Sequence, residues 1–371
     1  MNSQYDIAIL GGGLAGLTSA IHLKKEGFKV IVIEKNTYPK HKVCGEYISN
    51  EVWIYLNEIG IKLDSLQPAK IDTLHFSLKS GNEIEMKLPM GGFGISRYSL
   101  DFYLYNVAQS LGVIIIQDTV QEVVFDSDTF KILTKNNKIV ANVALGAFGK
   151  RSNLDINLNR KFIKKKSNWV GIKAHYKVDF PKNIVGLYHF NGGYCGVSQI
   201  ENNVVNICYL ANYKEFKKYR DIEEFQENSI KQNHQLKTIF NNATLVMEKP
   251  LTISQISFNK KETVTNHILM IGDTAGLIHP LCGNGMAMAI HSAKLAADEV
   301  TKFLLKRINR KELEQNYTAN WKKNFKTRLA FGRILSSIIK KEKIAAIALG
   351  IAIRFPIILR FIISKTHGKT I

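Results

Sequence analysis

Two kinds of pattern alternate along this chain: short apolar runs typical of buried strands, and longer stretches whose apolar residues recur at helical spacing. The first apolar run, residues 5–10, reads YDIAIL and leads directly into three consecutive glycines. Residues 14–26 have apolar positions at a helical period, and Gly27 stops them, as glycine does at many helix ends. A second β-branched run, residues 29–34, completes a strand–helix–strand unit whose two strands should be parallel.

The rest of the chain keeps to these two patterns. Helical spacing predicts further helices over 51–59, 99–111, 221–238 and 286–305. Apolar or alternating runs predict strands within 71–88, 113–124, 131–143, 169–210 and 267–271. We expect residues 131–143 to form a hairpin that turns at Asn136 and Asn137. Glycines interrupt residues 169–210, which we expect to form a separate antiparallel sheet.

The turn after the first strand carries the first chemical signal. Its glycines follow the pattern Gly11-x-Gly13-x-x-Gly16, between a strand and a helix. Gly11 permits the tight turn, Gly13 lets a pyrophosphate approach the backbone, and Gly16 lets the helix and strand come close. The phosphates would meet the free N–H groups at the helix N-terminus. Glu34 ends the second strand. A carboxylate at this position can accept hydrogen bonds from ribose hydroxyls. It would also repel a 2′-phosphate, so NADP is not expected in this site.

A second glycine-rich segment lies far downstream. The strand predicted within 267–271 delivers Gly272 and Asp273 into a loop that runs to Gly283-Asn284-Gly285-Met286. A carboxylate at a strand end can hold a polyol chain, and a helix N-terminus near these glycines can stabilise negative charge on a reduced flavin ring. A plain NAD enzyme needs no such distant segment. The alternative is a loop that only caps the following helix.

Two further signatures complete a resemblance to a known family. They are the segment Lys42-Val43-Cys44-Gly45-Glu46 and the pattern Arg97-x-x-x-Asp101, which stand between the two glycine motifs. In this order and spacing, over residues 1–300, the motifs resemble the geranylgeranyl reductase-like flavoproteins, within the wider p-hydroxybenzoate hydroxylase-type FAD superfamily. The resemblance implies FAD as the cofactor and an oxidoreductase as the activity.

The same resemblance implies positions for the cofactor. The pyrophosphate would lie at Gly11, Gly13, Leu14, Ala15 and Gly16, and Glu34 would bind the adenosine ribose, with Lys35 standing where relatives often carry an arginine. Arg97 would lie beside the cofactor. The ribityl and pyrophosphate region would meet Gly272 and Asp273, and the isoalloxazine would lie near Gly283, Asn284, Gly285 and Met286.

The chain departs from this family at two places. Relatives often carry Gly-Ala-Asp-Gly in mid-chain, whereas this chain has Phe148 in place of the aspartate. Related hydroxylases use that segment for both FAD and NAD(P)H, so we expect NAD(P)H alone to reduce the flavin poorly. The electron donor would be NAD(P)H or a reduced carrier protein. The aromatic Tyr-x-Trp-x-Phe-Pro segment of the reductases is also missing, and Tyr194-Cys195-Gly196-Val197-Ser198 stands in its place.

Three functions remain open at this point. The first is hydride transfer to or from a carbon–carbon bond of a bulky, apolar, isoprenoid- or lipid-like substrate; the second is an FAD-dependent monooxygenase that hydroxylates such a substrate or an aromatic one. The third is a non-catalytic lipid-escort protein, against which the intact cofactor motifs argue. Cys44 is the candidate catalytic residue, for proton or redox chemistry, with an inert buried thiol as the alternative. His279 is either a proton-transfer group or a packing residue.

These motifs and patterns indicate the fold class and how the chain divides into domains. The predicted fold class is α/β, with a Rossmann-like FAD-binding domain, a second antiparallel β-sheet substrate domain and a helical C-terminal region. The FAD-binding domain is discontinuous, over 1–70, 95–165 and 265–312. The substrate domain covers 71–94 and 166–264, and the basic helical region covers 313–371.

Charge and cysteine content add two constraints. A formal net charge of +20 often indicates a polyanionic partner. The chain shows no zinc-finger spacing, no RNA-binding aromatic signature and no helix-turn-helix pattern, so nucleic acid is not expected. The four cysteines form no CxxC pair, which predicts no metal site and favours reduced thiols in the cytoplasm.

The C-terminal region suggests a peripheral place on a membrane. Basic residues are interleaved with apolar ones there, and Ile347, Ile351, Phe355 and Ile358 stand at helical spacing. Such a segment can lie on an anionic bilayer surface, or it can pack its apolar side on the main body. Pro356 should end or kink the helix, and the last apolar stretch is too short to span a bilayer.

Overall fold

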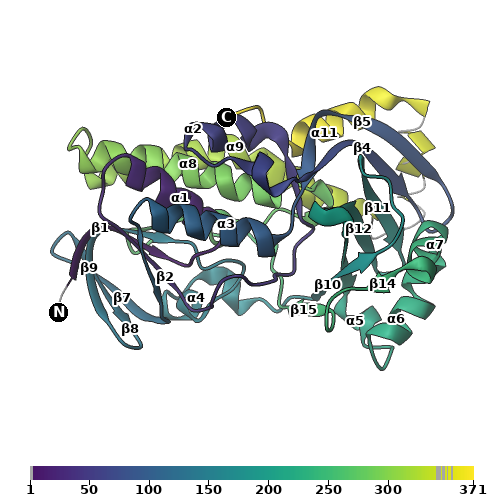
Figure 1. The fold of residues 1–371 in the computed structure, drawn as a ribbon, viewed down its shortest axis with the longest axis horizontal. Coiled ribbons are helices and arrows are strands. Elements are labelled where there is room, and N and C mark those ends of the chain that lie inside the picture. The colour runs from purple at the N-terminus through teal and green to yellow at the C-terminus, as the bar shows by residue number, and fades with distance from the viewer. Residues whose placement is uncertain (1–2, 340–343, 345–346, 349, 352–353) are drawn as a thin grey trace.

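The computed structural model describes residues 3–339, 344, 347–348, 350–351 and 354–371. Two β-sheets stand at opposite ends of an elongated molecule, with long helices beside them (Figure 1). The first sheet contains β1 (Ser3–Leu10), β2 (Val30–Glu34), β6 (Ile114–Gln117), β7 (Val120–Asp126), β8 (Thr129–Thr134), β9 (Lys138–Gly146), β16 (Val264–Thr265) and β17 (Ile268–Met270). The second contains β3 (Tyr47–Ser49), β4 (Ala69–Ser77), β5 (Glu83–Gly94), β10 (Trp169–Lys177), β11 (Ile184–Phe190), β12 (Gly193–Gln199), β13 (Val205–Asn212), β14 (Thr244–Leu245) and β15 (Leu251–Ser254).

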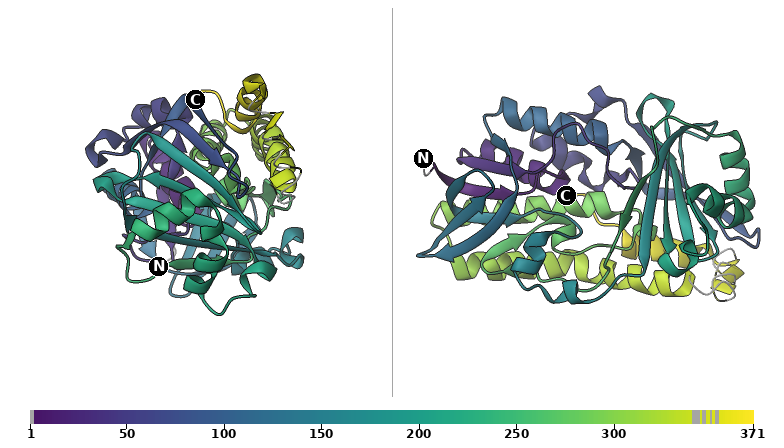
Figure 2. Two further views of the ribbon diagram at one scale, coloured as in Figure 1. Left: turned by 90° about the vertical axis from the view of Figure 1, so that its right-hand side faces the viewer. Right: turned by 90° about the horizontal axis from the view of Figure 1, so that it is seen from below.

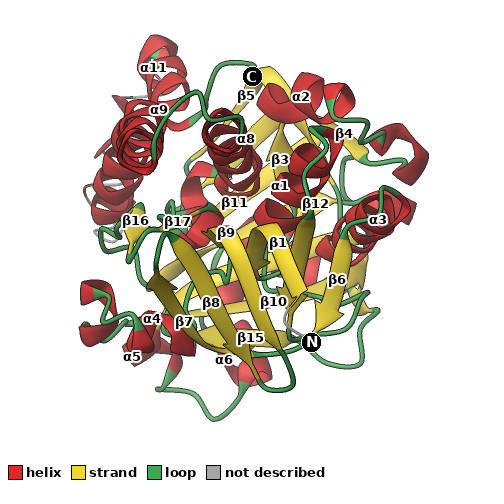
Figure 3. Cartoon of the chain, turned by 90° about the vertical axis from the view of Figure 1, so that its left-hand side faces the viewer, coloured by secondary structure: helices red, strands yellow, loops and turns green. Residues whose placement is uncertain are grey.

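The α-helices lie around these sheets. They are α1 (Leu14–Lys25), α2 (Trp53–Glu58), α3 (Arg97–Ser110), α4 (Asn153–Asn157), α5 (Tyr213–Phe216), α6 (Ile222–Asn228), α7 (His234–Asn242), α8 (Gly285–Leu304), α9 (Arg310–Ile339) and α11 (Pro356–Thr366). Helices α1, α3 and α8 accompany the first sheet, whereas α5, α6 and α7 lie against the second (Figures 1 and 3). The α/β fold class expected from the sequence is confirmed.

Buried apolar strands form the centre of the first sheet. β1 lies between β2 and β9 and is parallel to both, with Ile7 opposite Val30 on one side and Val143 on the other. These three side chains are fully or almost fully buried. Continuous β-branched runs suit strands that are covered on both faces, which is the usual situation in a parallel sheet. The predicted parallel strand–helix–strand unit is therefore confirmed.

A hairpin adds antiparallel strands to the first sheet. β8 pairs with β9 on one side and with β7 on the other. The turn between β8 and β9 is closed by the Thr134 N–H, which donates to the carbonyl oxygen of Asn137 over 2.9 Å. The hairpin predicted to turn at Asn136 and Asn137 is confirmed.

The helices predicted within 51–59, 99–111 and 286–305 are present as α2, α3 and α8. The prediction of one polar helix over 221–238 is wrong, because α6 ends at Asn228 and a new helix, α7, begins at His234. Asn233 explains the break. Its side-chain oxygen accepts hydrogen bonds from two N–H groups of α7, and its amide donates to Ser77 and to the carbonyl of His189. Asn233 therefore caps α7 and ties it to the second sheet.

The second sheet runs in the order β14-β10-β13-β12-β11-β4-β5-β3. Most of its neighbouring strands are antiparallel, but β4 and β11 are parallel, with Thr73 opposite Ile184. The antiparallel arrangement expected for residues 169–210 is confirmed for β10 to β13, and the parallel pair arises where β4 joins β11. A long crossover separates the two strands in the chain, so no hairpin forces them to be antiparallel. β3 also belongs to this sheet, although the sequence placed its residues, 47–49, with the first domain.

The first part of the basic C-terminal region belongs to the main core. In α9, Tyr317 and Phe325 are fully buried and Trp321 is 7% exposed, within the apolar cluster that surrounds the first sheet. Helix α11 begins at Pro356, as predicted for a break at this residue, and the C-terminal helices form a layer at the edge of the molecule (Figure 2). No helix in the described part of the chain is both long and apolar enough to cross a bilayer.

Candidate cofactor and substrate site

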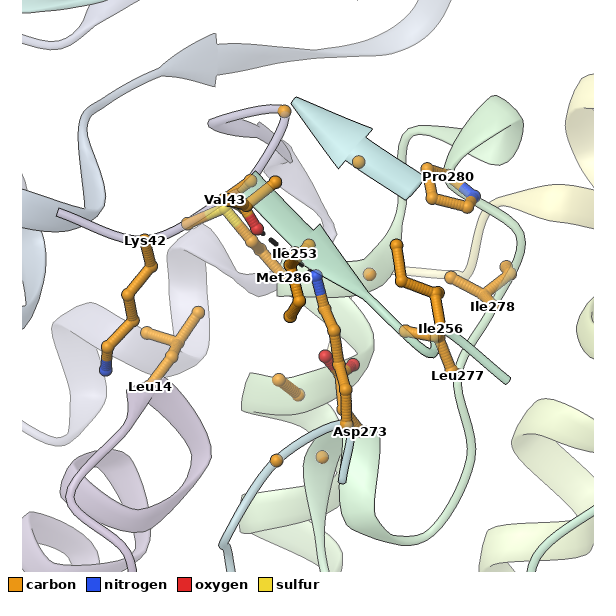
Figure 4. Close-up of a pocket in the computed structure, with 18 of the residues that line it drawn as sticks. Leu14, Lys42, Val43, Ile253, Ile256, Asp273, Leu277, Ile278, Pro280 and Met286 are labelled. Carbon is orange, nitrogen blue, oxygen red and sulfur yellow. Dashed lines mark hydrogen bonds between the residues drawn. The ribbon is translucent and has the colours of Figure 1, made fainter. Parts of the chain in front are cut away.

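A cavity of about 1790 Å³ lies between the two sheets. Both glycine motifs line it, together with the segment 41–47 and side chains from the second sheet and the C-terminal helices. Cys44 and every residue expected to bind the cofactor border this cavity except Gly16, whose function is structural. Figure 4 shows Leu14, Lys42, Asp273 and Met286 around the same space.

In the first glycine motif, Gly11 and Gly16 are required by the fold, whereas Gly13 leaves room for a ligand. Gly11 has φ +115°, and a Cβ there would lie 2.5 Å from the carbonyl oxygen of Ala147. A Cβ at Gly16 would lie 2.0 Å from the carbonyl oxygen of Gly11. Gly13 differs, because its backbone is extended and a Cβ would meet only the Arg97 and Lys42 side-chain nitrogens, each at 3.8 Å. The protein itself therefore leaves room at Gly13, which fits a pyrophosphate approaching the backbone.

Positive charge surrounds the N-terminus of α1. No side chain caps this helix end. Asp101 accepts hydrogen bonds from Arg97 Nε and Nη2, both over 2.7 Å, and from Lys42 Nζ over 2.8 Å. Burial acts to raise the pKa of Asp101, but the two cations outweigh it and the pKa is lowered. Two cations thus share one carboxylate beside uncapped helix N–H groups, an arrangement suited to a diphosphate.

Glu34, which is expected at the adenosine ribose, lies in a hydrogen-bonded network. Its carboxylate accepts a hydrogen bond from the Gly12 N–H over 2.8 Å, and bonds from the backbone and side-chain nitrogens of Asn36 over 2.9 and 2.6 Å. The Tyr38 hydroxyl donates to the Gly12 carbonyl oxygen over 2.5 Å. Glu34 and Lys35 both line the cavity, as does Asn36. Sequence reasoning missed Asn36 and Tyr38, which hold the carboxylate and the glycine turn together.

The second glycine motif packs against the first. Gly272 has φ +59°, and a Cβ there would lie 3.0 Å from the Cβ of Ala15 in α1. Asp273 follows, with its side chain at the cavity (Figure 4) and its carbonyl oxygen accepting a hydrogen bond from Lys261 Nζ over 2.8 Å. Burial lowers the pKa of Lys261 to about 8. The motif therefore brings a carboxylate beside the helix N-terminus, where a ribityl–pyrophosphate linkage would pass.

The loop before α8 is tied to the C-terminus. Asn284 is fully buried, and its side-chain nitrogen donates to Glu51 over 3.2 Å and to the Thr366 carbonyl oxygen over 3.1 Å. Glu51 also accepts hydrogen bonds from Arg328 over 2.9 Å and from the Gly368 N–H over 2.5 Å. The sequence assigned Asn284 to the flavin ring but gave no role to Glu51 or Arg328. No local pattern could have revealed a pair so far apart in the chain.

Cys44 sits in a segment that the second sheet holds in place. The carbonyl oxygens of Cys44 and Gly45 accept hydrogen bonds from the side chain of Asn206, over 3.2 and 2.9 Å. The buried Glu46 carboxylate accepts a bond from Lys173 Nζ over 3.0 Å, and His175 Nε2 lies 2.6 Å away. Burial opposes ionisation of Glu46, yet these two partners lower its pKa. This anchored segment presents the half-buried Cys44 to the cavity.

His279, Tyr194 and Phe148 differ in their positions relative to the cavity. His279 is buried among Trp169, Tyr194 and Phe258, with ring centroids 4.6–5.8 Å from its own, and it does not line the cavity. This position favours the packing alternative. Tyr194 does line the cavity. So does Phe148, which stands where relatives carry an aspartate.

Removing the Asp273 carboxylate should weaken the retention of the cofactor without unfolding the chain. Loss of a charge-assisted hydrogen bond to a ligand costs about 1.5–3 kcal/mol, roughly a 10- to 150-fold rise in Kd. We therefore expect Asp273→Ala to bind FAD more weakly by this factor, as measured by fluorescence titration of the apoprotein. Wild-type affinity in a folded Asp273→Ala protein would show that this carboxylate does not contact the cofactor.

Comparison with known proteins identifies the family of this chain. The family described as "FAD binding domain" matches residues 4–320. Digeranylgeranylglycerophospholipid reductase of Methanocaldococcus jannaschii is 25% identical over 339 residues, which covers 87% of this chain and 83% of that protein. Conditioned medium factor receptor 1 of Dictyostelium discoideum is 26% identical over 337 residues, which covers 80% of this chain but only 63% of that protein, less than two thirds of its length.

A solved structure shares the whole fold. The flavin-dependent brominase Bmp2 superposes with a TM-score of 0.82 at 18% identity, over 98% of this chain and 93% of that one. Likeness at this level of identity shows the fold alone. The family match extends over most of the chain and includes both glycine motifs. The chain therefore belongs to the FAD binding domain family, and it is an FAD-dependent oxidoreductase.

Proposed function

We propose that this enzyme transfers hydride between FAD and a carbon–carbon bond of a long, apolar, isoprenoid-like substrate. The observation that carries the proposal is the continuity of the cavity, which runs from the cofactor residues to an apolar face of the second sheet. That part of the lining is formed by Leu74, Phe76, Ile84, Leu88, Val185 and Leu187. A wall of this kind excludes water and gives an extended hydrocarbon chain a surface to bury.

Saturation of a double bond needs a hydride and a proton. Bound FAD, in its reduced form, supplies the hydride. The chain itself must hold the substrate, keep water out and provide the proton. Cys44 has a thiol at the cavity in a segment fixed by Asn206 and Glu46, so we assign it the proton. The name of the reductase relative supports a substrate with an isoprenoid chain.

The proposal can be tested anaerobically with the FAD-loaded protein. The flavin is first reduced with dithionite, and geranylgeraniol in detergent is then added while the flavin absorbance is followed. We expect reoxidation together with a product two hydrogen atoms heavier by mass spectrometry. Because Phe148 replaces the aspartate of relatives, NADPH in place of dithionite should reduce the flavin slowly when no substrate is present.

A substitution at Gly196 tests whether the substrate occupies this cavity. A Cβ at this cavity-lining position would meet its nearest neighbours at 3.6 and 3.8 Å, so the backbone leaves room for a side chain to begin there. Gly196→Leu should retain FAD and dithionite reduction but lose reoxidation by the polyprenol. If geranylgeraniol reoxidises neither protein while oxygen yields a hydroxylated product, the monooxygenase alternative replaces the proposal.

A further inference from the structure

Exposed apolar side chains gather in the C-terminal segment. Ile357 is 74% exposed and Ile347 is 65% exposed, and Phe355 and Phe361 are each more than half exposed. Soluble proteins rarely leave such a concentration of large apolar side chains in water unless it contacts a partner. We refer to the residues that share this property as the C-terminal apolar surface: Ile347, Ile351, Phe355, Ile357, Ile358 and Phe361.

This surface lies in a strongly basic part of the chain. Residues 321–371 contain twelve lysines and arginines against one acid, Glu342. Arg354 is exposed between two members of the surface, and Lys365 Nζ lies 5.1 Å from the centre of the Phe361 ring. Phe361 also contacts Phe331 of α9, on which Lys323 and Lys326 are exposed. Apolar and cationic side chains are thus combined on the same helices.

Helix α11 has two faces with different surroundings. Residues three or four apart share a face of a helix, so Ile357, Ile358 and Phe361 point outward together. Ile362, Ile363 and Thr366 line the cavity on the other side, and Ile363 packs with Tyr47, Ile71 and Leu88. The α11 helix alone therefore separates the exposed Ile357, Ile358 and Phe361 from the interior of the cavity.

We propose that the C-terminal apolar surface docks on an anionic lipid bilayer, with α11 between the bilayer and the cavity. The cations would meet lipid headgroups while the isoleucines and phenylalanines enter the boundary of the acyl chains. A second copy of this chain fits less well. A symmetric dimer would place two strongly basic surfaces face to face, and like charges would repel. The inference rests on this surface alone and not on the chemistry proposed for the cavity.

The test uses point variants of the full, FAD-loaded chain. Removing everything after residue 320 would be uninformative, because Trp321, Phe325 and Arg328 are buried in the main body. Ile347→Glu/Ile357→Glu changes two exposed positions and leaves packing intact. The matched control, Ile54→Glu/Leu305→Glu, adds the same charge at positions that are 53% and 49% exposed on α2 and at the end of α8.

Vesicle sedimentation measures how tightly each protein binds to lipid. We expect the wild-type protein and the control to bind phosphatidylglycerol-containing vesicles at low salt and to be released as salt rises, with little binding to pure phosphatidylcholine. The Ile347→Glu/Ile357→Glu protein should bind at least about tenfold more weakly. The inference is overturned if the wild-type protein ignores anionic vesicles, or if both double variants lose binding equally. It is also overturned if light scattering shows a dimer that only the Ile347→Glu/Ile357→Glu change dissociates.

Discussion

A Gly13→Val protein should fold normally and be purified without FAD. Its backbone at this position is extended, and a Cβ meets only the ends of the flexible Arg97 and Lys42 side chains, at 3.8 Å, which can shift to admit the methyl groups of valine. The valine would occupy the space where the pyrophosphate must approach, and we expect flavin content to fall about tenfold or more. A modest loss of about 1 kcal/mol or less is expected from the poorer helix N-cap. Flavin absorbance and thermal denaturation of the apoproteins measure the two effects.

Gly16→Ala provides the contrast within the same motif. Its Cβ would lie 2.0 Å from the Gly11 carbonyl oxygen, so this variant should fail in folding rather than in binding alone. A Gly13→Val protein with full flavin content would show that the cofactor does not cross the N-terminus of α1. An unfolded Gly13→Val protein would instead place Gly13 among the residues that the fold requires.

An Arg328→Met protein should lose about 3–5 kcal/mol of its free energy of unfolding. Glu51 is fully buried, and Arg328 is its cationic partner over 2.9 Å. Removal of the arginine leaves a carboxylate in the interior with only neutral donors, Asn284 and the Gly368 N–H. Urea denaturation, followed by far-UV circular dichroism with FAD at saturation in all samples, measures the change.

The companion variant Glu51→Gln/Arg328→Met tests how much of this loss comes from the unpaired, buried charge of Glu51. The glutamine oxygen can still accept hydrogen bonds from Asn284 and Gly368, and no buried charge remains. We expect the double variant to be more stable than Arg328→Met by about 1–3 kcal/mol. Equal stability of the two variants would mean that the ion pair does not hold the C-terminal segment as we describe.

The cofactor half of the fold could be predicted from the sequence because its signals are local. Gly11, Gly13 and Gly16 stand between a buried strand and an apolar helix, and Glu34 ends the next strand. Each of these features is confined to a few neighbouring residues. Parallel pairing of β1 and β2 then follows from the handedness and length of the connection.

The remaining features depend on contacts that no local pattern encodes. Glu51 meets Arg328 across most of the chain, and β3 joins the second sheet through pairing with β5. The break between α6 and α7 depends on Asn233, whose side chain reaches Ser77. Periodicity alone predicts one continuous helix over residues 221–238. Such contacts are fixed by tertiary packing, which overrides local propensity.

We expect one cavity to hold FAD beside an apolar chain, and a binding measurement tests this without turnover. Oxidised, FAD-loaded protein is titrated with geranylgeraniol in detergent, and the difference spectrum of the flavin's visible band is recorded. A nearby hydrocarbon chain changes the polarity around the flavin, so we predict a saturable perturbation in the wild-type protein and none in Gly196→Leu. An unchanged flavin spectrum at saturating geranylgeraniol in the wild-type protein would contradict the account.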